Sequence, residues 1–389
     1  MSTSTQKTNT RRPARQRTNL LRGNFQLFNE KGDLKLFSEP SDRGLKGVVF
    51  EKNKKVMDAF PRVKHVTVSA DTEMNMLSDT DVQKGRFYDH HEGALVRVYW
   101  ASETWQVSTQ KKIDAFRSRW GSAQSFGDTW SRAVAHLHDE NKENVENPLL
   151  ALFNTLDKKK QYLFIVRHNA ENRLVCDAPE NPTLFHVGTF SEGKLDPDDD
   201  IGLPKPATHK FESVDELKAH VLALSPSKLS GCLGRVQGEH GEKWIRFQND
   251  EYQRLERIRG NEPSLRFRYL QVRLDGNLVD GLYSLFPGHA TVFDECEDTI
   301  YSIAKYIHKA YMDRFIRRQF VTLEREFFSI MRICHEWHKE DRQNNKVDLD
   351  KVIEVINTRY DHVLNKMIRV FKSSVEENSR QGQEVCHEV

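Results

Sequence analysis

The polar run Asp89-His-His-Glu-Gly93 combines side chains that suit nucleophilic chemistry on phosphorus. An imidazole is a competent nucleophile toward phosphorus, and its ordinary pKa leaves it largely unprotonated at neutral pH. Glu92 stands two positions after His90, and Gly93 lets a backbone approach a ligand closely. We therefore take His90 as a candidate nucleophile. The alternative is that His90 and His91 are ordinary histidines at the end of a strand.

Short strands must position this run. Segments rich in β-branched and aromatic residues, partly alternating with polar ones, predict strands at residues 47–51, 62–68, 94–100, 105–108 and 162–166. Helices are interleaved, one over residues 109–120 and one over residues 214–224 that begins after the capping residue Ser213. The pattern predicts an α+β domain of antiparallel sheets with helices over residues 23–289.

The pattern of apolar residues changes from strand-like to helical near residue 290. Apolar residues such as Ile303, Ile307 and Ala310 recur at helical spacing, and no proline follows Pro287. We therefore expect an all-helical C-terminal domain over residues 290–380, followed by a frayed end at 381–389.

Charge is distributed unevenly along the chain. Residues 1–22 hold six Lys and Arg residues and no acid, while the whole chain carries a net charge of only +2. This composition predicts a disordered basic tail. Such a tail suits a polyanion partner, although a solvated tail without a dedicated partner has the same composition.

The chain shows no sign of a membrane or secretory route. No apolar run approaches roughly 18 residues, and the N-terminus lacks an apolar signal core. Five scattered cysteines without a close pair suit reduced thiols. We expect an intracellular protein of the cytoplasm or nucleus, with no membrane partner.

A longer stretch around the polar run resembles a known family. Residues 88–100 (Tyr-Asp-His-His-Glu-Gly-Ala-Leu-Val-Arg-Val-Tyr-Trp) and 105–112 (Trp-Gln-Val-Ser-Thr-Gln-Lys-Lys) look like the start of a covalent nucleotidyltransferase domain, shared by RNA ligases, DNA ligases and capping enzymes. There a Lys-x-Asp/Glu-Gly motif supplies an amine that attacks the α-phosphate of ATP. Glu92 and Gly93 keep this frame, and His90 stands at the lysine position, so the resemblance implies that His90 and Glu92 are the catalytic residues.

Further segments resemble phage-type RNA ligases, including those of tRNA repair, in the same order along the chain. They are residues 43–51 (Arg-Gly-Leu-Lys-Gly-Val-Val-Phe-Glu), 162–175 with Glu171-Asn-Arg173, 230–233 (Ser-Gly-Cys-Leu) and 243–252 (Lys-Trp-Ile-Arg-Phe-Gln-Asn-Asp-Glu-Tyr). The resemblance spans residues 40–275 and implies a nucleotidyltransferase domain of the ATP-grasp-like ligase type.

The resemblance also implies that the catalytic set is degenerate. Val166 falls where the family has a glutamate that reads the ribose, and Ser230 replaces a metal-linked acid. Of two phosphate-contacting lysines, one becomes Arg246, which keeps a charge, and the other becomes Gln248. Together with His90, these replacements indicate a pocket that has lost its covalent chemistry.

Two functions follow from this reading. The first is a catalytically inactive RNA ligase-like protein that binds RNA, such as a tRNA-like molecule, or acts as a structural or regulatory partner of another protein. A structural component of a virus particle is one such role. The second is an active nucleotidyltransferase that forms a nucleotidyl-His90 intermediate with ATP and Mg²⁺. The expected nucleotide-binding residues are Gly93, Lys111, Val166, Ser230, Arg246 and Gln248.

Basic residues cluster near these motifs and predict an RNA-binding surface. The expected contacts are Arg97, Lys112, Arg117, Arg119, Arg254 and Arg257. No metal ligands are predicted. The acidic run at residues 196–200 lacks the glycine-spaced pattern of a calcium loop. Cys334 and His338 have a spacing that could begin a zinc site, but they lack a second pair.

Overall fold

The computed structural model describes residues 24–41, 44–72, 74–140, 145–167, 172–238 and 241–385, with side chains up to residue 375. The predicted tail at 1–22, together with Arg43 and Glu171 of the quoted motifs, lies outside the described residues, as do residues 386–389 of the predicted frayed end. The chain divides into two compact units, Met1–Glu256 and Arg257–Val389.

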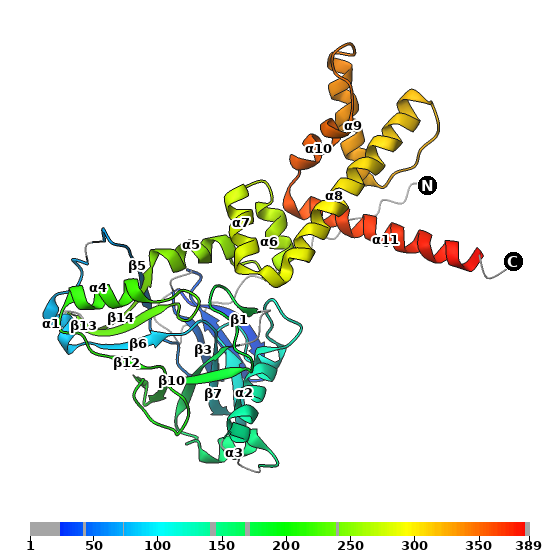
Figure 1. Cartoon of the computed structure of the whole chain (residues 1–389). Helices are drawn as coiled ribbons and strands as arrows, with labels where there is room; N and C mark the ends of the chain where they lie inside the picture. Colours follow the sequence, from blue (N-terminus) through cyan, green and yellow to red (C-terminus); the bar gives the residue numbers. More distant parts are fainter. Residues whose placement is uncertain are drawn as a thin grey trace. The chain divides into compact units, whose positions relative to one another are not determined.

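The first unit is built on three sheets, which Figure 1 shows in blue to green. A four-stranded antiparallel sheet has the order β1-β2-β3-β4. Its strands are β1 (Gln26–Lys31), β2 (Leu34–Ser38), β3 (Lys46–Glu51) and β4 (Lys54–Met57). This sheet contains the strand that the sequence predicts at residues 47–51.

A five-stranded antiparallel sheet, here called the central sheet, has the order β11-β10-β9-β7-β8. Its strands are β7 (Ala94–Ala101), β8 (Thr104–Thr109), β9 (Gln161–Arg167), β10 (Thr183–Ser191) and β11 (Lys194–Asp196). Side chains alternate across it, because successive residues of a strand point to opposite faces. Val96, Phe164 and Val166 on one face pack against Trp130, whereas Leu163 belongs to a different core cluster on the other face.

A second five-stranded sheet, here called the upper sheet, has the order β12-β6-β13-β14-β5. Its strands are β5 (Val63–Val68), β6 (Arg86–His90), β12 (Thr208–His209), β13 (Gly231–Gly238) and β14 (Gly241–Asn249). All pairs are antiparallel except β14 with β5. The strands predicted at 62–68, 94–100, 105–108 and 162–166 are therefore confirmed as β5, β7, β8 and β9.

The helices of the first unit are α1 (Asp79–Lys84), α2 (Phe126–Glu140), α3 (Pro148–Thr155) and α4 (Val214–Ala223). Helix α5 (Asp250–Arg259) follows β14 and contains the boundary between the two units. The predicted helix at 214–224 is confirmed as α4, and Ser213 caps it by accepting a hydrogen bond from the N–H of Glu216 at 3.2 Å. Leu217 and Val221 of α4 are buried against the upper sheet, which α4 covers in Figure 1.

The helix predicted over residues 109–120 is wrong. The segment holds only a single 3-10 turn, Ala115–Arg117, after β8 ends at Thr109. Tertiary hydrogen bonds replace the helical ones. The guanidinium of Arg97 donates to the carbonyl of Thr109 at 2.7 Å, and the side chain of Asn29 accepts from the N–H of Ile113 at 2.8 Å. These long-range contacts outweigh a weak local helical preference.

The second unit is helical. Its helices are α6 (Leu265–Val272), α7 (Gly276–Leu285), α8 (Ala290–Tyr311), α9 (Arg325–Glu340), α10 (Leu349–Asn357) and α11 (Asp361–Val385). The apolar stripe predicted from Ile303, Ile307 and Ala310 is buried. The predicted α+β fold class with a helical C-terminal region is thereby confirmed.

The division between the units falls after residue 256, ahead of the boundary predicted at residue 289. Helices α6 and α7 belong to the second unit because aromatic rings join them to α8. Tyr269 of α6 stacks on Phe293 of α8 with ring centroids 5.1 Å apart, and Tyr283 of α7 contacts the same ring at 5.2 Å. No helix among the described residues is both long and apolar enough to cross a membrane.

Candidate functional site

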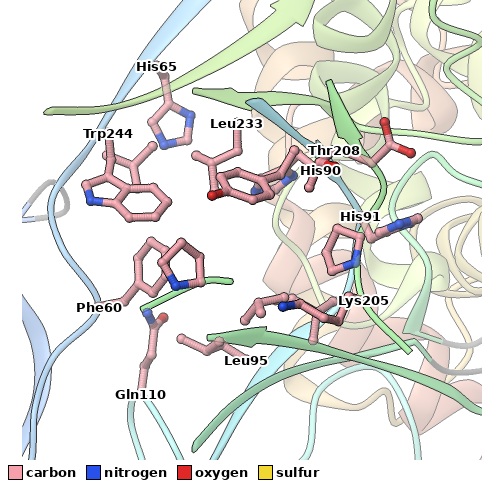
Figure 2. Close-up of a pocket in the computed structure, with 17 residues that line it drawn as sticks. Phe60, His65, His90, His91, Leu95, Gln110, Lys205, Thr208, Leu233 and Trp244 are labelled. Atoms are coloured by element: carbon pink, nitrogen blue, oxygen red, sulfur yellow. The ribbon is translucent and has the colours of Figure 1, made fainter. Parts of the chain in front are cut away.

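A cavity of about 310 Å³ in the first unit is lined by residues from both the central and the upper sheet. Figure 2 shows aromatic and imidazole rings around it, with Phe60 and Trp244 at one side and His90 and His91 at the other. The central sheet contributes Leu95, Ile165 and Val187, and the wall also includes Tyr88, Asp89, Gln110, Lys205, Thr208 and Leu233. The cavity is thus largely apolar, with a few polar groups that could orient a ligand.

Two large aromatic residues stand close together in the wall. The rings of Phe60 and Trp244 meet edge to face, with centroids 5.3 Å apart. Trp244 lies within residues 243–252, but it was not among the predicted site residues. The alternation of side chains along β14 could have identified it. Trp244, Arg246 and Gln248 share one face of this strand, whereas Ile245 and Phe247 pack in the core on the other.

His90 ends strand β6 and lines the cavity. Its Nδ1 lies 2.7 Å from the Oγ of Ser230, and the same hydroxyl donates to the main-chain carbonyl of His90 at 2.7 Å. A hydroxyl has one proton, and a carbonyl oxygen can only accept, so the hydroxyl proton goes to the carbonyl. The imidazole must then donate its Nδ1–H to Ser230. The lone pair of neutral His90 is therefore on Nε2.

The surroundings of His90 keep it neutral. Burial lowers the pKa of His90 well below its ordinary value, and the positive charge of Arg246 and the neighbouring rings of His65 and His91 lower it further. His91 stacks on Phe185 with centroids 4.0 Å apart, and burial lowers its pKa to about 4. Both imidazoles are therefore unprotonated at neutral pH.

The carboxylate of Glu92 is held by four donors. It accepts the main-chain N–H groups of Leu174, of Val175 at 2.8 Å and of Cys176 at 2.9 Å, and the hydroxyl of Tyr252 at 3.1 Å. Burial and this carboxylate raise the pKa of Tyr252, which stays a donor. Glu92 thus ties the β6–β7 turn to two distant segments, which is a structural role, and its catalytic role stays a prediction.

Gly93 has a packing role, and Val166 does not face the cavity. A Cβ at Gly93 would lie only 2.6 Å from the carbonyl oxygen of Val166, so glycine allows β7 and β9 to approach. The side chain of Val166 is buried in the core beside Trp130. The prediction for Val166 is therefore corrected, since strand alternation points its neighbour Ile165 into the cavity.

Ser230, Arg246 and Gln248 are brought together near His90. The guanidinium of Arg246 donates to the carbonyl of Ser230 at 3.3 Å and lies 5.7 Å from the ring of Tyr252. The side-chain nitrogens Nε of Arg246 and Nε2 of Gln248 are buried without a hydrogen-bond partner among the described residues. Neither Arg246 nor Gln248 lines the cavity, and a buried donor without a partner costs free energy.

The predicted RNA contacts divide into buried and exposed residues. Arg97 is fully buried and donates to the carbonyls of Gly47 and Thr109, so its prediction as an RNA contact is wrong. Burial lowers its pKa to about 10, and its guanidinium joins β7 to β3 and β8. Arg254 is exposed and paired with Glu251 at 2.7 Å.

Four predicted basic residues are exposed on the segment between β8 and α2 of the first unit, and this segment also holds one exposed ring. Lys111, Lys112, Arg117 and Arg119 are exposed, and Phe116 between them is 40% exposed. We call these five residues the basic patch. Lys111 does not line the cavity, whereas the neighbouring Gln110 does. Arg257 is exposed in the second unit.

The acidic run at residues 196–200 uses its carboxylates within the protein. Asp198 accepts a hydrogen bond from Tyr88 at 3.1 Å and pairs with Arg86 at 3.1 Å, and Asp199 lies 3.4 Å from Lys160. Cys334 is fully buried in the second unit. Among the described residues, the side chains that lie close enough together to bind one metal ion are Asp89, His209 and His220. Neither Cys334 nor the acidic run belongs to this group.

Comparison with known proteins gives relatives in viruses. No protein-family model matches the chain. It is 24% identical over 320 residues to the immediate-early protein ICP-46 homolog of Invertebrate iridescent virus 6, covering 78% of this chain and 70% of that protein. It is 27% identical over 229 residues to the homolog of Invertebrate iridescent virus 3 and 25% over 201 residues to immediate-early protein ICP-46 of Frog virus 3 (isolate Goorha). These two alignments span 48% and 49% of the relatives.

Solved structures similar to the chain include two forms of an archaeal ATP-dependent RNA ligase. Form 2 has a TM-score of 0.38 and 12% identity, covering 72% of this chain and 68% of that chain. Form 1 has a TM-score of 0.35 and 10% identity, covering 90% of this chain and 72% of that chain.

Proposed function

We propose that this chain is a ligase-type nucleotidyltransferase homologue that binds nucleotide units or RNA without forming a covalent adduct. The observation that carries the proposal is His90, which ends β6 at the cavity, where the resembling family has its reactive lysine. An imidazole held by Ser230 replaces a flexible amine. The neighbouring Glu92 is engaged by main-chain N–H groups and Tyr252. The site thus keeps its frame without the groups that the covalent step needs.

The cavity supports binding of a base. Its volume of about 310 Å³ is at the lower end of the range for small-molecule sites. Phe60 and Trp244 offer aromatic surfaces, and bases stack on such surfaces. Lys205 and Thr208 supply polar groups in the wall. A nucleotide or an unpaired base of an RNA would use the aromatic surfaces and these polar groups.

The basic patch supports binding of an RNA backbone. Exposed cations around a ring attract phosphates while the ring stacks on a base, and such binding weakens with salt. Relatives named as viral immediate-early proteins favour an RNA met inside an infected cell. If the chain binds neither RNA nor nucleotide, the proposal reduces to a structural or regulatory role in which the chain binds another protein.

Titration calorimetry with ATP, GTP and a short single-stranded RNA tests the cavity. Trp244→Ala should weaken binding about tenfold or more, because base–aromatic stacking is worth on the order of 1–3 kcal/mol. Trp100→Ala is the matched control, since this indole packs against Trp105 and does not line the cavity. Equal affinities in both variants would overturn the assignment of the cavity.

Fluorescence anisotropy with labelled RNA over a range of salt tests the basic patch. The double variant Lys111→Glu/Lys112→Glu should lower affinity and reduce the slope of log affinity against log salt, by about one for each phosphate that the variant no longer neutralises. Lys194→Glu is the control, because Lys194 is exposed on the separate strand β11. An unchanged slope would show that Lys111 and Lys112 do not contact the RNA backbone and would overturn the assignment of the basic patch.

Active nucleotidyl transfer is the second candidate, and one observation favours it. The bond from His90 to Ser230 leaves the imidazole lone pair on Nε2, which is the form that attacks phosphorus. The test is incubation with α-phosphate-labelled ATP or GTP and Mg²⁺ or Mn²⁺, followed by denaturing electrophoresis. We expect no labelled protein. A labelled band that is acid-labile, alkali-stable and absent from His90→Ala would establish the active enzyme instead.

A further inference from the structure

Three side chains that can bind a metal converge beside the upper sheet. Asp89 is on β6, His209 is on the edge strand β12, and His220 is on α4. One ligand atom from each lies within 4.8 Å of the others. The convergence is tertiary, because Asp89 and His209 are separated by 120 residues.

The backbone around these residues is well anchored. Strand β12 pairs with β6, and the N–H of Asp89 donates to the carbonyl of Ala207 at 2.9 Å. Helix α4 is fixed by the fully buried Leu217 and Val221. Rigid elements hold ligands at nearly constant separation, which is what a preformed metal site requires.

The contacts within the cluster leave one ligand nitrogen unused. The Nε2 of His209 lies 2.8 Å from the Oδ1 of Asp89, and the rings of His209 and His220 have centroids 4.6 Å apart. The Nε2 of His220 is buried and has no hydrogen-bond partner among the described residues. A buried polar atom without a partner costs free energy, which a bound cation would recover.

We propose that Asp89, His209 and His220 form a binding site for a divalent transition metal of the zinc class. Two imidazoles and one carboxylate are a donor set that Zn²⁺ accepts, with a water as fourth ligand, whereas Mg²⁺ and Ca²⁺ prefer oxygen ligands alone. On binding, His209 exchanges its hydrogen bond to Asp89 for a bond to the metal, and the proton that it carried on Nε2 moves to Nδ1 or to solvent.

A metal here would share one residue with the candidate site, because Asp89 also lines the cavity. It would join β12 and α4 to β6, the strand that carries Tyr88 and His90 to the cavity. Phe211 closes one side of the cluster, with its ring centroid 6.1 Å from that of His209 and 5.1 Å from that of His220. The role we assign is structural, and it does not depend on whether the cavity binds a nucleotide.

Calorimetric titration of the untagged, chelator-stripped full chain with ZnCl₂ tests the site. We expect one saturable equivalent, and Co²⁺ should bind there with visible absorption bands of a tetrahedral or five-coordinate ion. His220→Gln and His209→Gln should each weaken Zn²⁺ binding about 100-fold or more, since even loss of a residue that only supports a ligand costs about 10–100-fold. His362→Gln is the control, because its side chain is 71% exposed in the second unit.

Asp89→Asn separates a metal site from a simple hydrogen-bonded pair. The amide oxygen still accepts from His209, so a hydrogen-bonded pair would keep its thermal stability, whereas a metal site would lose affinity for Zn²⁺. Circular dichroism is the check that each variant is folded. Absence of a saturable equivalent in the wild type, or binding by His220→Gln and His209→Gln equal to that of the control, would overturn the proposal.

Discussion

The Nδ1 of His90 lies 2.7 Å from the Oγ of Ser230, and that hydroxyl donates back to the main-chain carbonyl of His90 at 2.7 Å. The reciprocal contact closes a small ring between the ends of β6 and β13. It fixes both the orientation and the tautomer of the imidazole. Ser230 is therefore the hydrogen-bond partner of His90, so under the proposed function the two positions change together.

Removal of the Ser230 hydroxyl should release this tautomer. In Ser230→Ala the Nδ1–H loses its acceptor, and we expect His90 to populate both neutral tautomers. The measurement is ¹⁵N NMR of histidine-labelled protein, with His90→Gln identifying the signal. Stability should fall by about 1 kcal/mol, the usual worth of a hydrogen bond. A single unchanged Nδ1–H tautomer in Ser230→Ala would contradict the coupling.

Glu92 should prove to be an anchor of the first unit. In Glu92→Gln the charge is lost and an amide nitrogen can face the N–H donors of Val175 and Cys176. We expect the free energy of unfolding to fall by about 2–4 kcal/mol, as for loss of a carboxylate with several partners. Urea unfolding followed by tryptophan fluorescence measures it, because five of the six tryptophans lie in the first unit. The control is Glu180→Gln, which should leave the free energy of unfolding unchanged because Glu180 is exposed. Equal stability of the two variants would show that Glu92 does not anchor the first unit.

Gly93 should be required for strand packing and not for ligand contact. A Cβ in Gly93→Ala would lie 2.6 Å from the carbonyl oxygen of Val166. Relief of this overlap must separate β7 from β9, and we expect a loss of about 1–3 kcal/mol, as for other overpacked sites. The same fluorescence assay applies. Gly276→Ala is the control, since nothing lies within 4 Å of its added Cβ.

Stability should fall as the pH is lowered. Burial lowers the pKa of the fully buried His186 to about 4, from an unfolded value of about 6.5. Above the pKa of the unfolded state, the His186 imidazole is neutral in both the folded and the unfolded protein. Below that pKa the imidazole binds a proton in the unfolded protein but stays neutral in the folded protein. Stability is therefore complete at neutral pH and is lost progressively as pH falls toward the folded pKa, by up to ~3 kcal/mol.

His186→Gln should flatten this dependence. Urea unfolding at about pH 7 gives the direct cost of the substitution, and the same experiment at about pH 5 should show a smaller fall for the variant than for the wild type. Parallel pH profiles would show that His186 does not titrate with a lowered pKa in the folded state.

Local patterns along the chain were sufficient for much of the fold. Alternation and β-branched residues identified β5, β7, β8 and β9, and Ser213 identified the start of α4. The segment at 109–120 could not be identified, because its conformation depends on Arg97 and Asn29 from other strands. The error at Val166 is one of register, since a shift of one residue along a strand exchanges the core face for the cavity face.

The sequence by itself determined the strands β3, β5, β7, β8 and β9, the helix α4 and the helical character of the C-terminal region. These properties rest on neighbours within one helical turn or one strand. Only the tertiary structure decided that Arg97 is buried, that Glu92 is held by four donors, and that Asp89 meets His209 across 120 residues. Such contacts depend on which strands pair and in what register, and that pairing is set by the packing of the whole core.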